Sequence, residues 1–400
     1  MALPLPEVSA EEFLQEIDAY RRRIPLKGTV ETTFRCNLNC VHCYVNEPAG
    51  SREVRERELP LERLLRLVDE IAEAGCLNLL LTGGEVLCRA DFPDLYVHAW
   101  RRGLRIVIFT NGTLVTDRVA DLLAAYPPNL VEITLYGATR ETYERVTRVP
   151  GSFDRCLEGI RRLRERGVRL ALKTAILTWN EHEFDAMRAL ADELGVRFRS
   201  DGMLNPRVDC GANRIAELQV PPERLVRLER RDDRRRQAFD GLMATVGEPQ
   251  GATVAPREVY GCGAGLIGFS VDPYGGLHLC ETARRNPFDL REATFGEGWT
   301  RHVPRVRARR WRDNPVCPKC SLLAACANCA GAAELEHGNP EAVVATFCEL
   351  THRRAFASLG DVAGHRADAS CCLGQMSRLP AEPGRLETRR AALALTAATD

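Results

Sequence analysis

One pattern repeats along the first half of the chain: a short apolar run, a turn, and then a longer stretch with apolar residues at helical spacing. Six alternating strand and helix units with largely apolar strands predict a parallel sheet with right-handed crossovers. Six units give an α/β fold, a partial (β/α)6 TIM-like barrel, whose chemistry is expected at the C-terminal ends of the strands. The predicted strands are the apolar runs 30–34, 77–81, 106–109, 131–135, 170–174 and 196–198. The glycines expected to end the intervening helices are Gly75, Gly103, Gly167 and Gly195.

At 400 residues the chain is long enough for two or three domains. We expect a helical lead-in over residues 1–27 and the barrel over 28–202. A polar linker follows over 203–258, and its charge run Glu229–Arg236 is typical of a solvated helical face. Residues 259–355 are rich in Gly, Pro and Cys, as in a small domain held together by metals more than by a core. The tail, 356–400, is expected to be weakly ordered or helical.

The composition narrows the class of protein. Lys and Arg together number 55, as do Asp and Glu, so no global field favours nucleic acid or anionic lipid. The first thirty residues lack the apolar segment of a signal peptide, and no run approaches the roughly 18 apolar residues of a spanning helix. We therefore expect a cytoplasmic protein with no nucleic-acid or membrane partner. Its 16 cysteines, 4% of 400 residues, are too few for a disulfide scaffold, and a reducing compartment favours metal binding by clustered thiols.

The first cysteine cluster follows the first predicted strand directly. In the segment CNLNCVHCY, Cys36, Cys40 and Cys43 have CxxxCxxC spacing. Three thiolates on one tight loop suit an iron–sulfur cube with one iron left open. The alternative is a zinc site, which prefers four protein ligands. His42 is the nearest fourth candidate, but it adjoins Cys43, and consecutive residues in an extended loop point apart.

Three short motifs stand where the second, third and fourth strands are expected to end: Gly83-Gly84-Glu85, Thr110-Asn111-Gly112-Thr113 and Thr134-Leu135-Tyr136-Gly137. Each alone is a common turn, but their placement at successive strand ends indicates a shared site. Glycines allow close backbone approach, and a carboxylate beside them can accept a hydrogen bond from an ammonium group. Lys173 is expected on the fifth strand, either binding a carboxylate inside the barrel or serving as a snorkelling structural lysine.

In this order and at these separations, CNLNCVHCY, TGGE, TNGT and TLYGAT resemble the radical S-adenosylmethionine (radical SAM) enzymes, over about residues 28 to 202. The resemblance implies that the three cysteines hold a 4Fe-4S cluster whose open iron chelates S-adenosylmethionine. One electron, from an external donor such as flavodoxin or ferredoxin, then yields a 5′-deoxyadenosyl radical that abstracts hydrogen from the substrate. The expected cofactor-binding residues are Tyr44, Gly83, Gly84, Glu85, Thr110, Asn111 and Thr134, with Lys173 as a further candidate.

Seven more cysteines form a second constellation with the spacing Cx12Gx4C, then Cx2Cx5Cx2C, and then a single Cys. Two zinc ribbons are one explanation, supported by the two CxxC pairs. The Cx5C step and the flanking single cysteines favour interleaved ligation instead. The seven are Cys262, Cys280, Cys317, Cys320, Cys326, Cys329 and Cys348.

This constellation resembles the SPASM extension of radical SAM enzymes, over about residues 259 to 350, which carries two auxiliary 4Fe-4S clusters. The resemblance implies that Cys262, Cys280 and Cys329 hold auxiliary cluster I, and that Cys317, Cys320, Cys326 and Cys348 hold auxiliary cluster II. The sequence departs from the family in having two rather than three residues between Cys326 and Cys329. It also lacks a cysteine a few residues before Cys262. Auxiliary cluster I is therefore expected either to have an open iron or to be closed by Cys210.

The resemblance favours a peptide maturase that installs an oxidative crosslink in a ribosomally made precursor, a thioether in preference to a carbon–carbon bond. An open auxiliary iron would bind a substrate thiolate. The alternatives are an anaerobic sulfatase-type formylglycine maturase or another side-chain oxidase, and, in a different class, a non-catalytic metal-binding interaction protein. Glu281 stands where sulfatase-maturing relatives have an aspartate, and it is either a proton acceptor or an exposed residue beside a cluster loop.

Two further expectations concern partners and the tail. Many such enzymes begin with a leader-binding domain, and 27 residues precede the barrel here. Leader recognition is therefore expected from a separate partner protein, from the 203–258 linker or from the tail. Cys371 and Cys372 are either redox-active or incidental. His278, His337 and His352 are expected to have structural or surface roles, with assistance to cluster ligation as the alternative.

Overall fold

The structure is a computed structural model that describes residues 14–15, 17–45, 47–209, 214–247, 258–326 and 329–376. The predicted parallel sheet is present, and each of its six strands begins and ends within three residues of the corresponding apolar run. The strands pair in chain order, each parallel to the next. They are β1 (Lys27–Thr33), β4 (Asn78–Gly83), β5 (Arg105–Thr110), β6 (Leu130–Thr134), β7 (Leu170–Ala175) and β8 (Arg197–Asp201).

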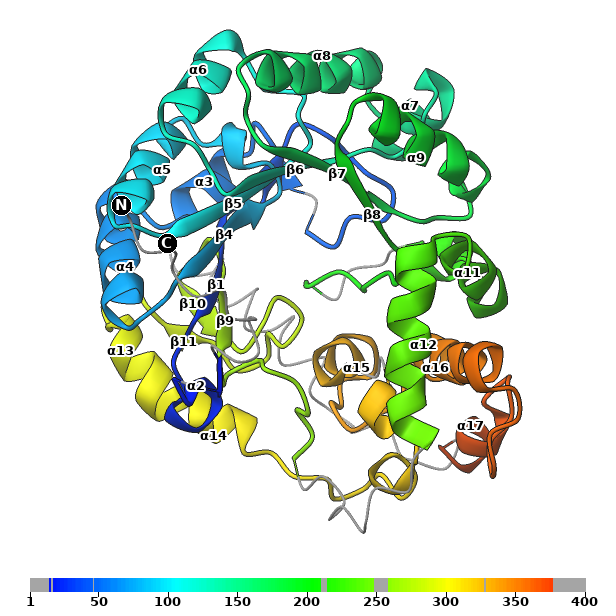
Figure 1. Cartoon of the computed structure of the whole chain (residues 1–400). Coiled ribbons are helices and arrows are strands. Elements are labelled where there is room, and N and C mark those ends of the chain that lie inside the picture. Colours follow the sequence, from blue (N-terminus) through cyan, green and yellow to red (C-terminus); the bar gives the residue numbers. More distant parts are fainter. Residues whose placement is uncertain are drawn as a thin grey trace, which may run out of the picture.

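Helices cover the outer face of this curved sheet (Figure 1). Leu64 and Leu67 of α4 lie in the same buried cluster as Leu79 of β4 and Ile106 of β5, so each helix buries its apolar stripe against the strands. The four glycines predicted to end helices all have positive φ. The helices and short turns of this part are α2 (Ala19–Arg22), α3 (Arg52–Arg57), α4 (Leu61–Glu73), η1 (Val86–Cys88), α5 (Phe92–Arg101), α6 (Asp117–Ala125), α7 (Arg140–Thr147), α8 (Ser152–Glu165), η2 (Glu181–Glu183) and α9 (Phe184–Glu193).

The sheet continues into the C-terminal half of the chain, which the sequence did not predict. Strand β9 (Gly268–Val271) pairs in parallel with β1, on the edge opposite β4. Strands β10 (Gly276–His278) and β11 (Phe288–Asp289) follow in antiparallel pairing, so the sheet has nine strands. The cysteine-rich region is therefore joined to the barrel by backbone hydrogen bonds as well as by the linker.

Of the remaining helices, α11, α12, α15, α16 and α17 lie together beside the open side of the barrel, whereas α13 and α14 lie near α4 and α2 (Figure 1). The predicted charge run is only partly solvated, because Glu229 is buried and accepts hydrogen bonds from Arg235 and from Arg354 of α16. These elements are α10 (Ile215–Leu218), α11 (Pro222–Glu229), α12 (Asp233–Gly247), α13 (Phe295–Glu297), η3 (Gly298–His302), α14 (Val303–Arg307), η4 (Cys317–Lys319), η5 (Leu323–Ala325), α15 (Ala330–His337), α16 (Ala345–Leu359) and α17 (Ser370–Met376).

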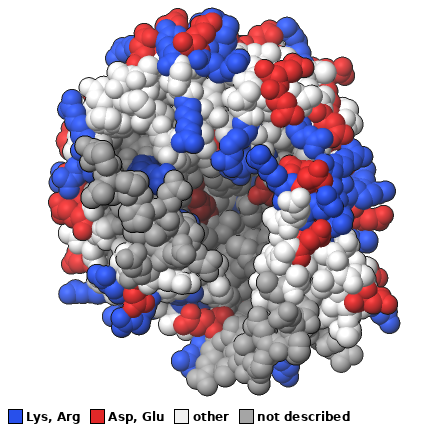
Figure 2. Space-filling model, viewed as in Figure 1, with Lys and Arg blue, Asp and Glu red and all other residues white. Residues whose placement is uncertain are grey.

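The expected fold class, an α/β partial barrel followed by a cysteine-rich C-terminal region, is confirmed. In the described part of the chain, no helix has both the length and the apolar character needed to cross a bilayer. On the face shown in Figure 2, basic and acidic side chains are interspersed around a central hollow. That distribution agrees with the zero formal net charge of the sequence.

Candidate functional site

The first cysteine cluster lies on the loop that leaves β1. Its first residues form β2 (Arg35–Cys36), which pairs with β3 (Glu47–Pro48). The backbone N–H groups of Asn39 and Val41 donate to Thr147 O and Val146 O at the end of α7, each at 3.0 Å. The fold itself therefore holds the loop in place.

Two thiols of this loop, those of Cys36 and Cys40, are hard to ionise, and the charge of a neighbouring thiol contributes to this. Burial raises the pKa of Cys36 to about 12, and the charges of Glu85 and Cys43 act in the same direction. Burial likewise raises the pKa of Cys40 well above its usual value, and the charges of Cys43 and Cys36 add to it. Thiolates in such a place need a cationic group among them, and a metal cluster would supply it. The donor set therefore fits an iron–sulfur cluster.

His42, the candidate fourth ligand of a zinc site, is half-buried and lies beside Tyr136. The two ring centroids lie 5.0 Å apart in an edge-on arrangement. Burial lowers the pKa of His42 to about 4, so the imidazole is neutral at pH 7. Its Nδ1 is buried and has no hydrogen-bond partner among the described residues.

The strand-end motifs meet at the cysteine loop. Glu85 is fully buried, and its carboxylate accepts hydrogen bonds from Thr110 Oγ1 at 2.8 Å, Asn111 N at 2.7 Å and Leu87 N at 3.1 Å. The side-chain amide of Asn111 in turn donates to Cys36 Sγ at 3.7 Å. The ends of β4 and β5 are thus connected to a predicted cluster ligand by a continuous set of hydrogen bonds.

The glycine pair before Glu85 has a packing requirement of its own. Gly83 has a φ of +133°, and a Cβ there would lie 2.0 Å from Thr33 O. A Cβ on Gly84 would lie 2.5 Å from the carbonyl oxygens of Phe34 and Arg35. Only glycine allows the end of β4 to approach the start of the cysteine loop this closely.

Lys173 lies inside the barrel with other charged residues that face the same space. Its Nζ is 2.8 Å from the centroid of the Phe109 ring and 4.0 Å from Glu132 Oε2. Glu132 also accepts hydrogen bonds from Arg199 of β8 at 2.6 to 3.0 Å. Burial and the charge of Arg199 lower the pKa of Lys173. Thr134 of β6 pairs in register with Lys173.

A second charged group lies across the barrel, at β1. Glu281 accepts a hydrogen bond from Thr29 Oγ1 at 2.8 Å, so its carboxylate faces β1. Glu31, on the same strand, is fully buried and accepts a hydrogen bond from Arg284 at 2.5 Å. Burial raises the pKa of Glu31 to about 7 despite the Arg284 charge, and its Oε1 has no partner in the described structure. The buried phenol of Tyr44 lies close enough to Glu31 for that charge to raise its pKa further.

Sequence reasoning missed Glu31, Glu132 and Arg284. Glu31 and Glu132 each interrupt an apolar run that was assigned to a buried strand. A charged residue inside such a run indicates a side chain that faces the barrel interior rather than the helices.

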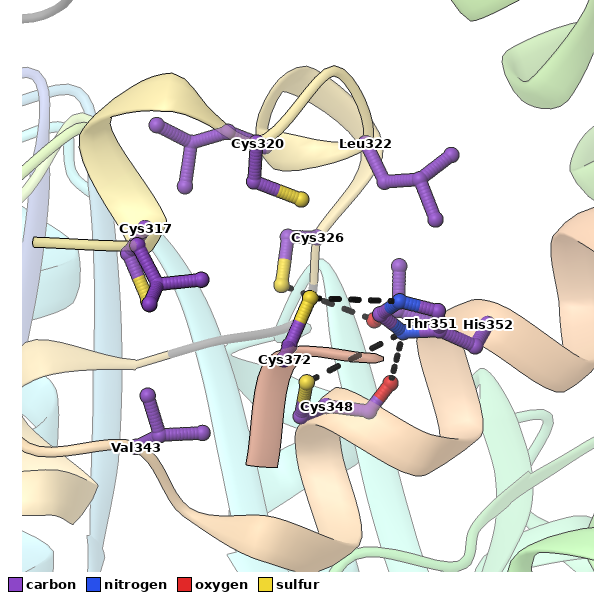
Figure 3. Close-up of a pocket in the computed structure, with 11 residues that line it drawn as sticks. Cys317, Cys320, Leu322, Cys326, Val343, Cys348, Thr351, His352 and Cys372 are labelled. Atoms are coloured by element: carbon purple, nitrogen blue, oxygen red, sulfur yellow. Dashed lines mark hydrogen bonds between the residues drawn. The ribbon is translucent and has the colours of Figure 1, made fainter. Parts of the chain in front are cut away.

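The four cysteines assigned to auxiliary cluster II line one pocket (Figure 3). Cys317 and Cys320 come from the segment around η4, Cys326 follows η5, and Cys348 lies on α16. Burial raises the pKa of Cys348 to about 12, and the charges of the other three cysteines add to it. Four thiols from separate segments that converge on one pocket fit a cluster with four protein ligands.

The residues assigned to auxiliary cluster I are only partly brought together. Thr282 Oγ1 lies 3.3 Å from Cys280 Sγ and 3.7 Å from Cys329 Sγ, so these two thiols are neighbours. Cys262 is exposed. Cys210, the alternative closing ligand, lies outside the described residues.

Four additional donors, from His352, His365, Cys371 and Cys372, gather beside the auxiliary II pocket. Their ligating atoms all lie within 4.8 Å of one another. Cys372 is buried and lines the pocket itself. The adjacent cysteines of the predicted tail are thus part of a defined structure on α17.

Comparisons with known proteins give a family match and several similar chains. Residues 30–191 match the model of the radical SAM superfamily. The chain is 36% identical over 165 residues to the AdoMet-dependent heme synthase of Methanosarcina barkeri, a match that covers 41% of this chain and 46% of that relative.

Two other similarities extend over most of the chain. The mycofactocin maturase MftC of Mycolicibacterium smegmatis is 29% identical over 353 residues, 84% of each chain. The crystal structure of Streptococcus suis SuiB bound to S-adenosylmethionine superposes with a TM-score of 0.61 at 16% identity, over 85% of this chain and 82% of that one, which shows a shared fold. Both matches cover far more than residues 30–191, so they extend beyond the barrel, as the predicted SPASM extension requires.

Proposed function

We propose that this chain is a radical SAM peptide maturase that installs an oxidative crosslink, a thioether or a carbon–carbon bond, in a ribosomally made precursor peptide. The proposal rests chiefly on one observation. Hydrogen bonds link Glu85 through Asn111 to Cys36 at the C-terminal ends of β4 and β5. The similarity to a maturase over 84% of both chains supports a peptide as the substrate.

The barrel residues would hold the cofactor as follows. Cys36, Cys40 and Cys43 bind a 4Fe-4S cluster, which with S-adenosylmethionine supplies the one-electron chemistry that abstracts a hydrogen atom from the substrate. A carboxylate has about four acceptor positions. Glu85 uses three of them within the protein, so one remains for the ammonium group of S-adenosylmethionine. The other proposed contacts are those of Tyr44, Gly83, Gly84, Thr110, Asn111, Thr134 and Lys173.

An oxidative crosslink removes two hydrogens from the peptide, and one of them must leave as a proton. We propose Glu281 as the acceptor, because Thr29 holds its carboxylate against the inner side of β1, next to the predicted ligand Cys280. Glu31 is the second candidate, since a carboxyl with a pKa of about 7 can accept and release a proton near neutral pH.

The cysteine-rich region would carry the remaining electron away. Cys317, Cys320, Cys326 and Cys348 are proposed to hold auxiliary cluster II, and Cys262, Cys280 and Cys329 to hold auxiliary cluster I. We further propose a flavodoxin or ferredoxin as electron donor, a separate leader-binding protein, and a cytoplasmic location, where thiols stay reduced. The proposed units are the core over 28–202, the linker over 203–258, the SPASM domain over 259–355, and the flanking segments 1–27 and 356–400.

The test uses the full chain, reconstituted anaerobically with iron and sulfide and supplied with S-adenosylmethionine, a reductant and synthetic peptides that contain Cys with Asp or Thr. The expected products are 5′-deoxyadenosine and a peptide that has lost two hydrogens and kept its sulfur. Loss of the cysteine sulfur would instead support the formylglycine alternative. Failure to form 5′-deoxyadenosine would reject radical SAM activity. The Cys36→Ala chain, which lacks one proposed cluster ligand, measures the background formation of 5′-deoxyadenosine.

A further inference from the structure

The four donors beside the auxiliary II pocket come from two helices and the turn between them. His352 lies on α16, His365 lies in the turn, and Cys371 and Cys372 lie in the first turn of α17. Cys371 Sγ lies 3.7 Å from Cys372 Sγ, and each sulfur lies 3.6 Å from His352 Nε2. His365 Nδ1 lies 3.9 Å from Cys371 Sγ and 3.0 Å from His352 Nε2.

These separations are close to the edges of one coordination tetrahedron. With zinc–sulfur bonds of about 2.3 Å and zinc–nitrogen bonds of about 2.05 Å, the edges are about 3.8 Å (S to S), about 3.6 Å (S to N) and about 3.3 Å (N to N). The observed distances are 3.7 Å, 3.6 to 3.9 Å and 3.0 Å, in the same order. Five of the six edges are therefore close to those of a zinc tetrahedron, and the sixth, from Cys372 Sγ to His365 Nδ1, is within 4.8 Å.

The second nitrogen of each imidazole is hydrogen-bonded outside the group of four. His352 Nδ1 lies 2.8 Å from Cys348 O, a carbonyl that only accepts, so Nδ1 carries the proton and Nε2 has the lone pair. His365 Nε2 lies 2.9 Å from Ser321 Oγ, which leaves Nδ1 to face the thiols. Such outer partners fix the tautomer and the ring orientation of metal-binding histidines.

We propose that His352, His365, Cys371 and Cys372 bind one zinc ion in a closed structural site. Two thiolates and two imidazoles in a tetrahedron are a donor set typical of zinc. A Rieske centre has the same four residues, but there the two histidines bind one iron and the two cysteines bind the other. The short sulfur-to-nitrogen separations fit a single ion better than that arrangement.

The site is distinct from auxiliary cluster II, although the two are neighbours. The cluster has four thiols of its own, and Cys348, one of them, lies one helical turn before His352 (Figure 3). Cys372 lines the same pocket and marks the point where the two sites meet. Zinc would fasten α17 to α16 and thereby hold the C-terminal helix over the cluster pocket, because metal binding and local folding are coupled.

Metal analysis of the full chain tests the proposal independently of activity. After iron and sulfide reconstitution, incubation with zinc sulfate and desalting, the wild type is expected to hold about one zinc per chain in addition to its iron. His365→Ala is expected to lose the zinc and keep the iron and sulfide. His337→Ala, a half-exposed histidine of α15, is the matched control and should keep both.

Two results would overturn the proposal: a wild type without zinc, or loss of about four irons with their sulfide in the His365→Ala chain. The second result would place His365 at a cluster instead. Cobalt substitution gives a separate readout that does not depend on a folded variant. The wild type should show the visible absorption of tetrahedral thiolate-bound Co²⁺, and a spectrum of six-coordinate cobalt would mean that the 3.0 Å contact is only a hydrogen bond between two histidines.

Discussion

The two cysteine regions of this molecule are built in opposite ways. In the barrel loop, three thiols lie within eight consecutive residues; the loop donates backbone hydrogen bonds to α7, and Asn111, at the end of β5, donates to Cys36. In the C-terminal region, three thiols of auxiliary cluster II lie within residues 317–326, and the fourth, Cys348, lies 22 positions further on; all four meet around a pocket. The barrel fold holds the first loop through backbone hydrogen bonds, and we expect the second site to depend more on bound ions to hold its segments together.

The largest expected effect is the loss of 5′-deoxyadenosine formation when a cysteine of the barrel loop is replaced. Replacing Cys36 with alanine should reduce 5′-deoxyadenosine formation to background and remove about four of about twelve irons. The barrel should stay folded, because its loop is held by backbone hydrogen bonds that the substitution leaves in place. Cys156→Ala, which changes a buried cysteine of α8, is the control and should keep all its iron. Equal iron loss in both variants would contradict the assignment.

Replacing Cys348 should have the complementary effect. Cys348→Ala is expected to lose about four irons as well, yet to cleave S-adenosylmethionine at a rate of the same order as the wild type. The crosslinked peptide should no longer form, because the electron has no path away from the substrate. Mass spectrometry of nucleoside and peptide from one reaction measures both products. If Cys348→Ala lost both S-adenosylmethionine cleavage and peptide crosslinking, the functions of the two cysteine regions would not be separable.

Metal removal should distinguish the two regions by stability. When a chelator strips the oxidised chain, amide exchange in α16 and α17 should accelerate by about tenfold or more, since their segments lose the ions that join them. Exchange in β4, β5 and β6 should change little, because the hydrophobic cluster beneath the sheet remains. Hydrogen exchange read by mass spectrometry checks this pattern, and uniform acceleration would refute it.

The smallest expected effect concerns the pH dependence of Glu31. Its folded pKa of about 7 exceeds the unfolded value of 4.5, so the folded state holds the proton more tightly. Stability from this group is fully present below pH 4.5 and is lost as pH rises through 7, a total on the order of 3 kcal/mol. In Glu31→Gln this fall should disappear from a plot of Tm against pH. An unchanged slope would show that Glu31 does not titrate in this range.

Periodicity was enough to predict the barrel, because strand and helix patterns are local properties of the sequence. The strand-end motifs were also predictable, since parallel strands place their C-terminal ends along one edge. The pairing of β9 with β1 was not, because it joins residues more than 200 positions apart. The proposed zinc site was missed for a different reason: its four donors lie within 21 consecutive residues, but nothing in the sequence indicates that α17 packs beside His352.

The most direct test of the account is the iron content of the full chain after anaerobic reconstitution. Three 4Fe-4S clusters, one in the barrel loop and two in the C-terminal region, predict about twelve irons per chain with matching sulfide. About eight irons should remain when Cys36, Cys40 and Cys43 are all replaced by alanine. About four irons in the wild type, or zinc in place of iron at the barrel loop, would contradict the three-cluster account.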